Sequence, residues 1–343
     1  MENTILVVGG GHQGLAMAAH LALNGETVNL WNRSPSNIRK VIDTNYIHCN
    51  GVVKGSAEIN KASPYIGDIM ADLIMVTTPA MAHKDIARLL ADYVSNNSVI
   101  ILNPGRTYGA VEFRRELLAQ NCKRMPVIAE TQTIVYTCRR DDSNNVNIYA
   151  MKKDVLISAE SDEHMEAAYG KLPKCLQMYF AKAKSMTFTS LGNVGMILHC
   201  APVLMNIGWI ENKKVDFKYY YEGITPSIAG FLEKMDRERL AVARMLGCEL
   251  ETTADWLRRS YRVEGKNLYE CIRNNESYKD IYAPKSLKHR YLDDDLPFGL
   301  VPLESTARHF GIGTPCVTAV IDVASIITGV DYRSIGRFYT PEN

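Results

Sequence analysis

The sequence predicts an α/β N-terminal doubly wound (Rossmann) domain followed by an all-α C-terminal domain. In the first half, short runs rich in Val, Ile and Leu alternate with helical patterns. After about residue 185 the strand patterns nearly vanish, while helical patterns continue. A chain of 343 residues also exceeds the size of one ordinary hydrophobic core. We therefore expect two domains, residues 1–185 and 186–343.

The apolar runs of the first half show almost no alternation with polar residues, as expected of strands covered on both faces. The helical patterns between them imply parallel strands joined by right-handed crossovers. The predicted strands are Thr4–Val8, Thr27–Trp31, Leu73–Thr77 and Val99–Leu102, with a hairpin at His48–Ile59 and two further strands within Val146–Ala159. The predicted helices are His12–Asn24, Ser36–Thr44, Met81–Val94, Gly109–Ala119 and Glu163–Leu172.

The second half predicts helices almost throughout. Their expected ranges are Ser190–Asn212, Ser227–Leu246, Ala254–Tyr261, Ser305–Phe310 and Pro315–Thr328. One stretch, Val194–Ile210, carries no formal charge, as a membrane span would. It is short for a span and contains Pro202 and Asn206. We therefore predict a buried core helix and no contact with a membrane.

The composition favours a small-molecule partner. The formal net charge is +1, from 39 basic and 38 acidic residues, which leaves no field to attract nucleic acid or an anionic membrane. None of the eight cysteines forms a CxxC pair, so we expect reduced thiols and no metal site. No basic segment precedes an apolar stretch at the N-terminus, and we expect a cytoplasmic protein.

A glycine motif follows the first predicted strand. Gly9, Gly11 and Gly14 fit GxGxxG, with His12 and Gln13 between them, and a predicted helix begins within the motif. The first glycine permits the tight turn, the second leaves room for a pyrophosphate, and the third lets the helix approach the strand. The helix N-terminus offers N–H groups to phosphates. The motif predicts a dinucleotide site; a glycine-rich turn without a ligand is the alternative.

The end of the second predicted strand bears on the choice of cofactor. An NAD enzyme usually places Asp or Glu there to bind the ribose hydroxyls. This chain has Asn32, Arg33 and Ser34 instead. A guanidinium can pair with a 2′-phosphate, so the sequence favours NADP(H), with NAD(H) as the alternative cofactor. Arg33 as a solvated loop charge is the competing interpretation.

Two more loops are expected to border the nicotinamide. Thr78 and Pro79 follow the third predicted strand listed above, and Asn103 and Gly105 follow the fourth. Ligands in open α/β sheets lie at the carboxyl ends of strands. Because proline and glycine occur in many strand-to-helix loops, these residues are equally consistent with ordinary connections.

Three motifs of the second half together resemble the opine dehydrogenase family, which includes the octopine and nopaline dehydrogenases. They are Leu191–Val194 with His199 and Pro202; Tyr220–Ser227; and Arg290–Asp295 with Gly299–Leu303. Through Ile101–Gly105 and Glu130–Thr131 the chain also resembles the bacterial N-(1-carboxyethyl)norvaline dehydrogenase. The similarity runs from Val7 to Gly336. That bacterial enzyme has an acidic residue after its second strand, where this chain has Asn32–Arg33, so its NAD preference is not carried over.

The resemblance implies an NADPH-dependent opine dehydrogenase that condenses an L-amino acid with an α-keto acid, such as pyruvate, and reduces the imine to a secondary-amine dicarboxylate. It assigns a catalytic His–Asp pair to His199 and Asp295, and a carboxylate-binding arginine to Arg290. Asp294 is the fallback for the carboxylate.

The chemistry of these residue types agrees with that assignment. Imidazole, with an ordinary pKa of ~6.5, can accept and return protons near neutral pH. A carboxylate on its other ring nitrogen fixes the tautomer and stabilises the imidazolium. Pro202, inside a helix, would free the carbonyl of Leu198 and kink the chain beside His199. Without the resemblance, a histidine on an apolar helix is more often a core residue, and Asp293–Asp295 would be a solvated loop.

Weaker candidates for substrate contact are Glu130, Thr131 and Asn206. Asn206 lies seven residues beyond His199, hence on the same helix face. A bridging core amide is equally consistent with Asn206.

Two other function classes compete. A hydroxy-acid or hydroxy-phosphate dehydrogenase of the glycerol-3-phosphate or ketopantoate reductase kind would need a catalytic lysine near the domain junction, where Lys182 and Lys184 match no such motif. A non-catalytic NADP(H) sensor would need no acid–base pair. The apolar helices of the second domain are compatible with a homodimer.

Overall fold

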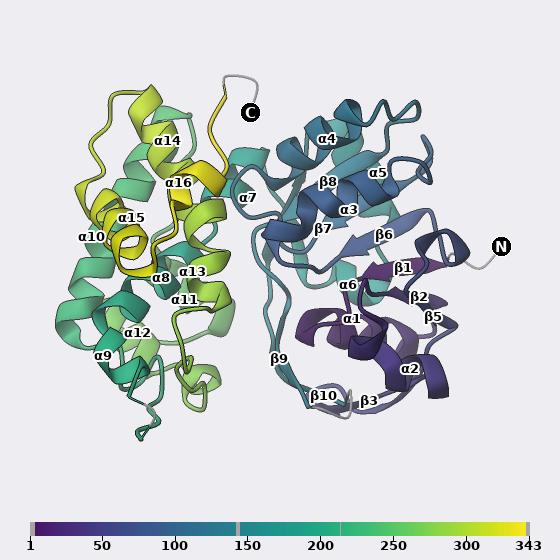
Figure 1. The fold of residues 1–343 in the computed structure, drawn as a ribbon, viewed down its shortest axis with the longest axis horizontal. Helices are drawn as coiled ribbons and strands as arrows, with labels where there is room; N and C mark the ends of the chain where they lie inside the picture. Colours follow the sequence, from purple (N-terminus) through teal and green to yellow (C-terminus); the bar gives the residue numbers. More distant parts are fainter. Residues whose placement is uncertain (1–3, 142–144, 213, 341–343) are drawn as a thin grey trace. The chain divides into compact units, whose positions relative to one another are not determined.

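The computed structural model describes residues 4–141, 145–212 and 214–340, and these form two compact units. The α/β unit comprises residues up to 105 and residues 109–186. The helical unit comprises residues 106–108 and residues from 187 onward. The predicted order, a doubly wound α/β fold followed by an α-helical fold, is confirmed (Figure 1).

The main sheet of the α/β unit has the strand order β12-β11-β8-β7-β6-β1-β2-β5. Neighbouring strands are parallel except β11 and β8, which are antiparallel. The strands are β1 (Ile5–Val8), β2 (Val28–Trp31), β5 (Lys61–Ser63), β6 (Leu73–Val76), β7 (Val99–Leu102), β8 (Val127–Thr131), β11 (Val155–Ala159) and β12 (Phe180–Lys182). The order of β5, β2, β1, β6, β7 and β8 reverses between β1 and β6, as in dinucleotide-binding folds.

The strands lack polar alternation because both faces of the sheet are covered. In β1, Ile5 and Val7 pack in one hydrophobic core, and Leu6 and Val8 pack in another on the opposite face. The helices of this unit are α1 (His12–Leu23), α2 (Arg39–Thr44), α3 (His83–Leu90), α4 (Gly109–Ala119), α5 (Asp162–Lys171) and α6 (Lys174–Gln177), with 3₁₀ turns at Pro35–Ile38, Ile66–Asp68 and Ala80–Ala82.

A second sheet, in the order β4-β3-β10-β9, packs beside α1 (Figure 1). Its strands are β3 (Tyr46–Gly51), β4 (Gly55–Glu58), β9 (Tyr136–Arg140) and β10 (Val146–Met151). The predicted hairpin is confirmed as the antiparallel pair β3 and β4. Strand β3 also pairs with β10, which is distant in the sequence. The sequence did not predict β9, nor β5, β8 and β12 of the main sheet.

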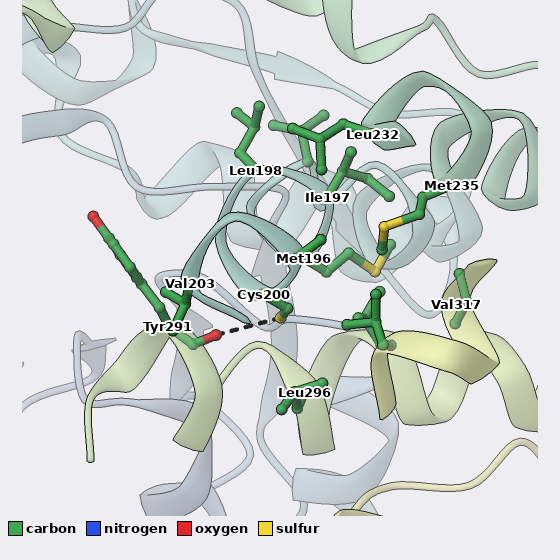
Figure 2. Close-up of a cluster of buried hydrophobic side chains, with 14 of the residues drawn as sticks. Met196, Ile197, Leu198, Cys200, Val203, Leu232, Met235, Tyr291, Leu296 and Val317 are labelled. Atoms are coloured by element: carbon green, nitrogen blue, oxygen red, sulfur yellow. Dashed lines mark hydrogen bonds between the residues drawn. The ribbon is translucent and has the colours of Figure 1, made fainter. Parts of the chain in front are cut away.

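The helical unit is built around α8, whose apolar side chains contact several other helices (Figure 2). In that figure, Met196, Ile197 and Leu198 lie beside Leu232 and Met235 of α10. The helices are α7 (Met186–Leu191), α8 (Gly195–Met205), α9 (Ile207–Ile210), α10 (Pro226–Met245), α11 (Thr253–Tyr261), α12 (Leu268–Arg273), α13 (Arg290–Asp293), α14 (Val301–His309), α15 (Pro315–Thr328) and α16 (Tyr332–Ile335), with a 3₁₀ turn at Glu276–Tyr278 and a π-helical turn at Leu296–Leu300.

The predicted single helix over Ser190–Asn212 is instead three helices, α7, α8 and α9. The break between α7 and α8 is stabilised by Asn193, whose side-chain oxygen accepts a hydrogen bond from the Gly195 N–H at 3.2 Å. By length and composition, Met186–Met205 is apolar enough to cross a membrane, yet 78% of its most apolar window is buried inside the structure. That burial is typical of a core helix.

Candidate active site

The glycine loop between β1 and α1 has the shape of a phosphate cradle. Gly9 adopts a φ of +116°, which favours glycine. A Cβ at Gly14 would lie 1.6 Å from the Gly9 carbonyl oxygen, so only glycine lets α1 start this close to the strand. Gly11 is exposed, and a Cβ there would meet no atom within 4 Å. The loop is thus closed on the protein side and open on the other.

Polar atoms beside this loop have no hydrogen-bond partner within the described residues. They are the buried Oγ1 of Thr78 and the buried Oε1 of Gln13. Thr78 follows β6, and the neighbouring Thr77 binds the end of β1, where its N–H donates to the Val8 carbonyl at 2.9 Å. Both orphaned atoms therefore lie near the reversal of strand order. Together with the open face at Gly11, they fit a dinucleotide.

His12, within the glycine motif, begins α1 and is held by a residue that the sequence did not single out. His12 Nδ1 accepts a hydrogen bond from the Arg140 N–H at 2.9 Å. The Arg140 guanidinium donates to the carbonyls of Gly10 at 2.7 Å and Asn37 at 2.9 Å. Arg140 ends β9, a strand that the sequence did not predict, so no local signal linked this cation to the loop.

The residues after β2 divide into structural and exposed groups. Asn32 Oδ1 accepts from the Gly10 N–H at 2.8 Å, and its Nδ2 donates to the Ser34 carbonyl at 2.9 Å. Asn32 thus stabilises the glycine loop, a contact that the sequence did not predict. Arg33 is exposed, and its closest ionic partner is Asp85, at 3.7 Å.

The predicted loop residues of β6 and β7 lie at the strand ends. Pro79 is exposed and precedes the turn Ala80–Ala82. Asn103 is 1% exposed, and its Nδ2 donates to the Ile101 carbonyl at 2.8 Å. The Gly105 N–H donates to the Thr131 carbonyl at 3.2 Å.

Glu130 and Thr131, predicted to contact substrate, are buried at the end of β8. Glu130 Oε2 accepts a hydrogen bond from the Ala110 N–H at 2.9 Å at the start of α4. Thr131 Oγ1 donates to the Thr133 carbonyl at 2.9 Å. These contacts give both residues a structural role within the α/β unit.

In the helical unit, a histidine and an aspartate far apart in sequence form a direct pair. His199, on α8, places its Nδ1 2.8 Å from Oδ2 of Asp295, which follows α13. The imidazole stacks on the Tyr291 ring, with 4.0 Å between ring centroids. On the other side, Nε2 lies 3.1 Å from the Tyr220 hydroxyl. The Asp295 side chain is fully buried, whereas 14% of the His199 side chain stays exposed.

Arg290 begins α13 and is exposed. Its positive charge lowers the pKa of both His199 and Asp295, and its chain neighbour Tyr291 stacks on the His199 ring. No hydrogen bond or ion pair of its guanidinium is found in the part of the chain that the structure describes. The helical unit thus joins His199 to Asp295 and places Arg290 at the start of the short helix that carries Tyr291, while Asp294 and Asp295 both pair with Arg106.

The environment sets the ionisation of the pair. Burial lowers the pKa of His199, which outweighs the opposing effect of Asp295. Burial alone would raise the pKa of Asp295, but Arg106, and then His199 and Arg290, bring it down to about 2. At neutral pH the aspartate is therefore ionised and the imidazole neutral. Since an ionised carboxylate only accepts hydrogen bonds, Nδ1 carries the proton and Nε2 carries the lone pair.

Pro202 lies within α8 and leaves the carbonyl of Leu198 without its helical donor. The Tyr219 hydroxyl lies 3.4 Å from that carbonyl and donates to the His199 carbonyl at 2.6 Å. Tyr219, which the sequence did not single out, therefore supports the backbone that carries the imidazole. Asn206 ends this stretch, and its Nδ2 donates to the carbonyls of Pro202 at 2.8 Å and Gly223 at 2.9 Å. Those bonds are the ones expected of a bridging core amide.

The lysines near the junction show no such constellation. Lys182 Nζ pairs with Glu166 at 2.6 Å on the surface of the α/β unit, and Lys184 is exposed. Among the described residues, no group of three or more His, Cys, Asp or Glu side chains is able to hold a metal ion.

Comparison with known proteins decides the family. An opine dehydrogenase of Arthrobacter sp. (strain 1C) is 34% identical over 339 residues, covering 98% of this chain and 94% of that protein. This chain belongs to the opine dehydrogenase family. Residues 182–328 match the family described as NAD/NADP octopine/nopaline dehydrogenase, alpha-helical domain, and residues 5–121 match ketopantoate reductase PanE/ApbA. The ketopantoate reductase match is thus confined to the first part of the chain.

Solved structures of opine dehydrogenases share the fold. A structure of octopine dehydrogenase in complex with NADH and agmatine has a TM-score of 0.76 at 19% identity, covering 97% of this chain and 94% of that one. A yersinopine dehydrogenase with NADP⁺ bound has a TM-score of 0.76 at 13% identity, covering 100% and 95%. As an opine dehydrogenase, the chain is an NAD(P)-dependent oxidoreductase that acts on a CH–NH bond and reductively condenses an amino acid with a keto acid.

Proposed function

We propose that this opine dehydrogenase uses NADPH to condense an L-amino acid with pyruvate or a similar α-keto acid in the cytoplasm. The observation that carries the proposal is the His199–Asp295 pair, with Nδ1 and Oδ2 2.8 Å apart and the exposed Arg290 guanidinium nearby. It supplies a base, an orienting carboxylate and a binding group for a substrate carboxylate. When bound, the nicotinamide supplies the hydride that reduces the imine carbon.

The residues after β2 support NADPH over NADH. No carboxylate stands at the end of β2, where one would repel a 2′-phosphate. Arg33 is exposed there with only a 3.7 Å ionic contact to Asp85, so its guanidinium can reorient toward a phosphate. The yersinopine dehydrogenase of similar fold binds NADP⁺, whereas the octopine dehydrogenase binds NADH.

His199 acts as base and then as acid. Its Nε2 lone pair accepts a proton as the amino group of the substrate attacks the keto carbon. The imidazolium so formed is stabilised by Asp295 on Nδ1 and returns the proton as water leaves the carbinolamine. In the resting site the Tyr220 hydroxyl, 3.1 Å from Nε2, donates a hydrogen bond to this lone pair, so the substrate amine must take its place before the proton is transferred.

Arg290 binds the carboxylate of the keto acid. A guanidinium offers two parallel N–H donors, which fix the plane of a carboxylate as well as neutralise it. The charge of Arg290 acts on His199, because it lowers the pKa of the imidazole. A keto acid held there therefore lies near the base.

The test is a pairwise substrate screen. The protein is mixed with NADPH or NADH, pyruvate and each member of an amino-acid panel, and loss of the nicotinamide absorbance is followed. Turnover that requires both substrates and is faster with NADPH is the expected result. Turnover of a ketone or hydroxy acid alone would contradict the proposal, as would binding of NADPH without turnover of any pair. The variant His199→Gln should abolish turnover, whereas the control Lys182→Ala should retain it.

A further inference from the structure

The helical unit contains a buried arginine in contact with the His199–Asp295 pair. Arg106 is 5% exposed, although arginine is rarely buried without partners. Its Nη1 lies 2.8 Å from Asp295 Oδ1, and its Nη2 lies 3.0 Å from Asp294 Oδ2. Nη1 also donates to Asn193 Oδ1 at 3.0 Å. Three side chains therefore hold this guanidinium in one orientation.

The two oxygens of Asp295 have different partners: Oδ2 is hydrogen-bonded to His199, whereas Oδ1 forms an ion pair with Arg106 that lacks hydrogen-bond geometry. Oδ1 faces Arg106 and Oδ2 faces His199, each at 2.8 Å. A carboxylate held at both oxygens cannot rotate about its last bond without breaking one contact. The fold leaves room for this arrangement, because a Cβ at Gly195 would lie 2.9 Å from Arg106 Nη1 and 3.1 Å from Asp295 Oδ1.

We infer that Arg106 is a positioning residue of the catalytic pair: it fixes Asp295 so that Oδ2 holds His199 with Nδ1 protonated and Nε2 unprotonated. This inference rests on the proposed role of His199 as the base. Arg106 reaches no reacting atom through these contacts and acts through Asp295. Its charge also keeps the aspartate ionised, which the proton on Nδ1 requires.

Several charged or titratable groups act on the imidazole, and Arg106 is among them. Arg290 of α13 and Arg106 both lower the pKa of His199, whereas Asp295 raises it. The hydroxyls of Tyr220 and Tyr219 contact the ring Nε2 and the His199 backbone carbonyl.

Two further groups lie near the carboxylate. The Asp294 carboxylate pairs with Arg106, and the Cys200 thiol, whose pKa is raised by burial, is fully buried. Because Arg106 lowers the pKa of His199, removing the Arg106 charge should raise that pKa.

The experiment compares Arg106→Gln, Arg106→Lys and Asp294→Asn with the unchanged enzyme. In Arg106→Gln, kcat should fall at least about 10-fold, and the acidic limb of kcat/KM should move about one pH unit upward, since a neighbouring charge shifts a pKa by about 1–3 units. Arg106→Lys should return the limb to its original position while kcat stays reduced, because one ammonium cannot hold both carboxylates. Asp294→Asn removes the other carboxylate of the same arginine and should leave the limb in place.

A readout without turnover separates this inference from the proposed function. NMR titration of the ligand-free protein follows the His199 ring, assigned with His199→Gln. The ring should titrate at a higher pH in Arg106→Gln than in the unchanged protein or Asp294→Asn. An unchanged His199 titration, or an equal shift in Asp294→Asn, would overturn the inference even if imine reduction is observed. If Arg106→Gln does not fold, Arg106→Lys decides: full kcat in that variant overturns the inference.

Discussion

At the scale of single residues, the state of His199 follows from two opposing forces. Burial disfavours the imidazolium, while the adjacent carboxylate of Asp295 favours it, and burial prevails. The enzyme therefore rests with a neutral base and an ionised partner. A base poised in this way acts without first losing a proton to solvent.

Replacing Asp295 by Asn should preserve the shape of the pair and remove most of the activity. An amide on Nδ1 no longer selects the tautomer or stabilises the imidazolium, and in a comparable His–Asp pair of serine proteases this change costs about 10⁴-fold in kcat. We expect a loss of about 10³–10⁴-fold in kcat with little change in KM, measured under saturating substrates. Asp293→Asn, two positions earlier, is the matched control and should stay active; equal activity of Asp295→Asn would contradict the assignment.

Replacing Arg290 by Lys should weaken binding of one substrate only. The point charge of lysine cannot reproduce two parallel N–H donors to a carboxylate. The KM for pyruvate should rise about 10–100-fold, the loss expected for a charge-assisted hydrogen bond worth about 1.5–3 kcal/mol. The KM for the amino acid, measured in the same series, should change less. A rise confined to the amino acid would assign Arg290 to the other substrate.

At the scale of elements, the turn from β1 into α1 contains one glycine that the packing requires, Gly14, and one that the packing does not require, Gly11. A Cβ at Gly14 would collide with the Gly9 carbonyl, so Gly14→Ala should lower the melting temperature and abolish NADPH binding together. A Cβ at Gly11 would meet nothing in the protein. Gly11→Ala should therefore keep the melting temperature and weaken NADPH binding alone, measured by titration calorimetry. Equal destabilisation by both substitutions would contradict this division.

The Tyr219 hydroxyl binds backbone carbonyls of helix α8 in the turn before Pro202. Tyr219 is fully buried and donates to the backbone carbonyls beside His199. Tyr219→Phe should lower the free energy of unfolding by about 1–2 kcal/mol, because buried carbonyls lose their donor. Urea unfolding of the variant measures this loss. The exposed Tyr149, changed to Phe in parallel, should show no effect, and an equal loss there would remove the explanation.

Local patterns predicted the elements that local physics determines. The apolar runs of β1, β2, β6 and β7 have no alternation because both faces are buried, so they are recognisable from the sequence alone. Short edge strands such as β5 and β12 are three residues long and gave no such signal. The sequence also could not show that Ser190–Asn212 breaks at Asn193, because that break is stabilised by long-range contacts such as the one to Arg106.

The candidate site was predictable to the extent that it lies in motifs. His199, Asp295 and Arg290 were named through the family resemblance; the structure pairs His199 with Asp295, and the role of Arg290 stays a prediction. Arg106 was missed although it follows Gly105 directly, because its partners Asn193, Asp294 and Asp295 are distant in sequence, the nearest of them 87 residues away. Asn206, Glu130 and Thr131 have polar side chains whose bonds to backbone groups only the folded structure reveals.

At the scale of the whole molecule, acid should destabilise the protein through the catalytic pair. Asp295 has a folded pKa of about 2, below its unfolded value of about 3.9, so the stability it contributes is lost as pH falls from about 4 toward 2. His199 has a lowered pKa, so the unfolded chain gains a proton first as pH falls below ~6.5. Both effects have the same sign.

Urea midpoints measured from pH 7 down to pH 3 should therefore decrease steadily. Asp295→Asn should lose less stability between pH 4 and 3 than the unchanged protein does. Asp293 serves as the control, because burial raises its pKa, so that Asp293→Asn should not flatten the acid dependence. A flattening in the Asp293 variant alone would show that another group governs the acid response.

The membership of residues 106–108 in the helical unit also constrains how this enzyme can be recombined with its relatives. A chimaera joined once, near residue 186, would combine Arg106 from one parent with Asp294 and Asp295 from the other. If the parents differ around this cluster, one buried charge loses its counterion, a defect that costs about 3–5 kcal/mol. A viable exchange of substrate specificity must therefore transfer residues 106–108 together with the C-terminal half. The segments that have to be exchanged are thus not contiguous in the gene.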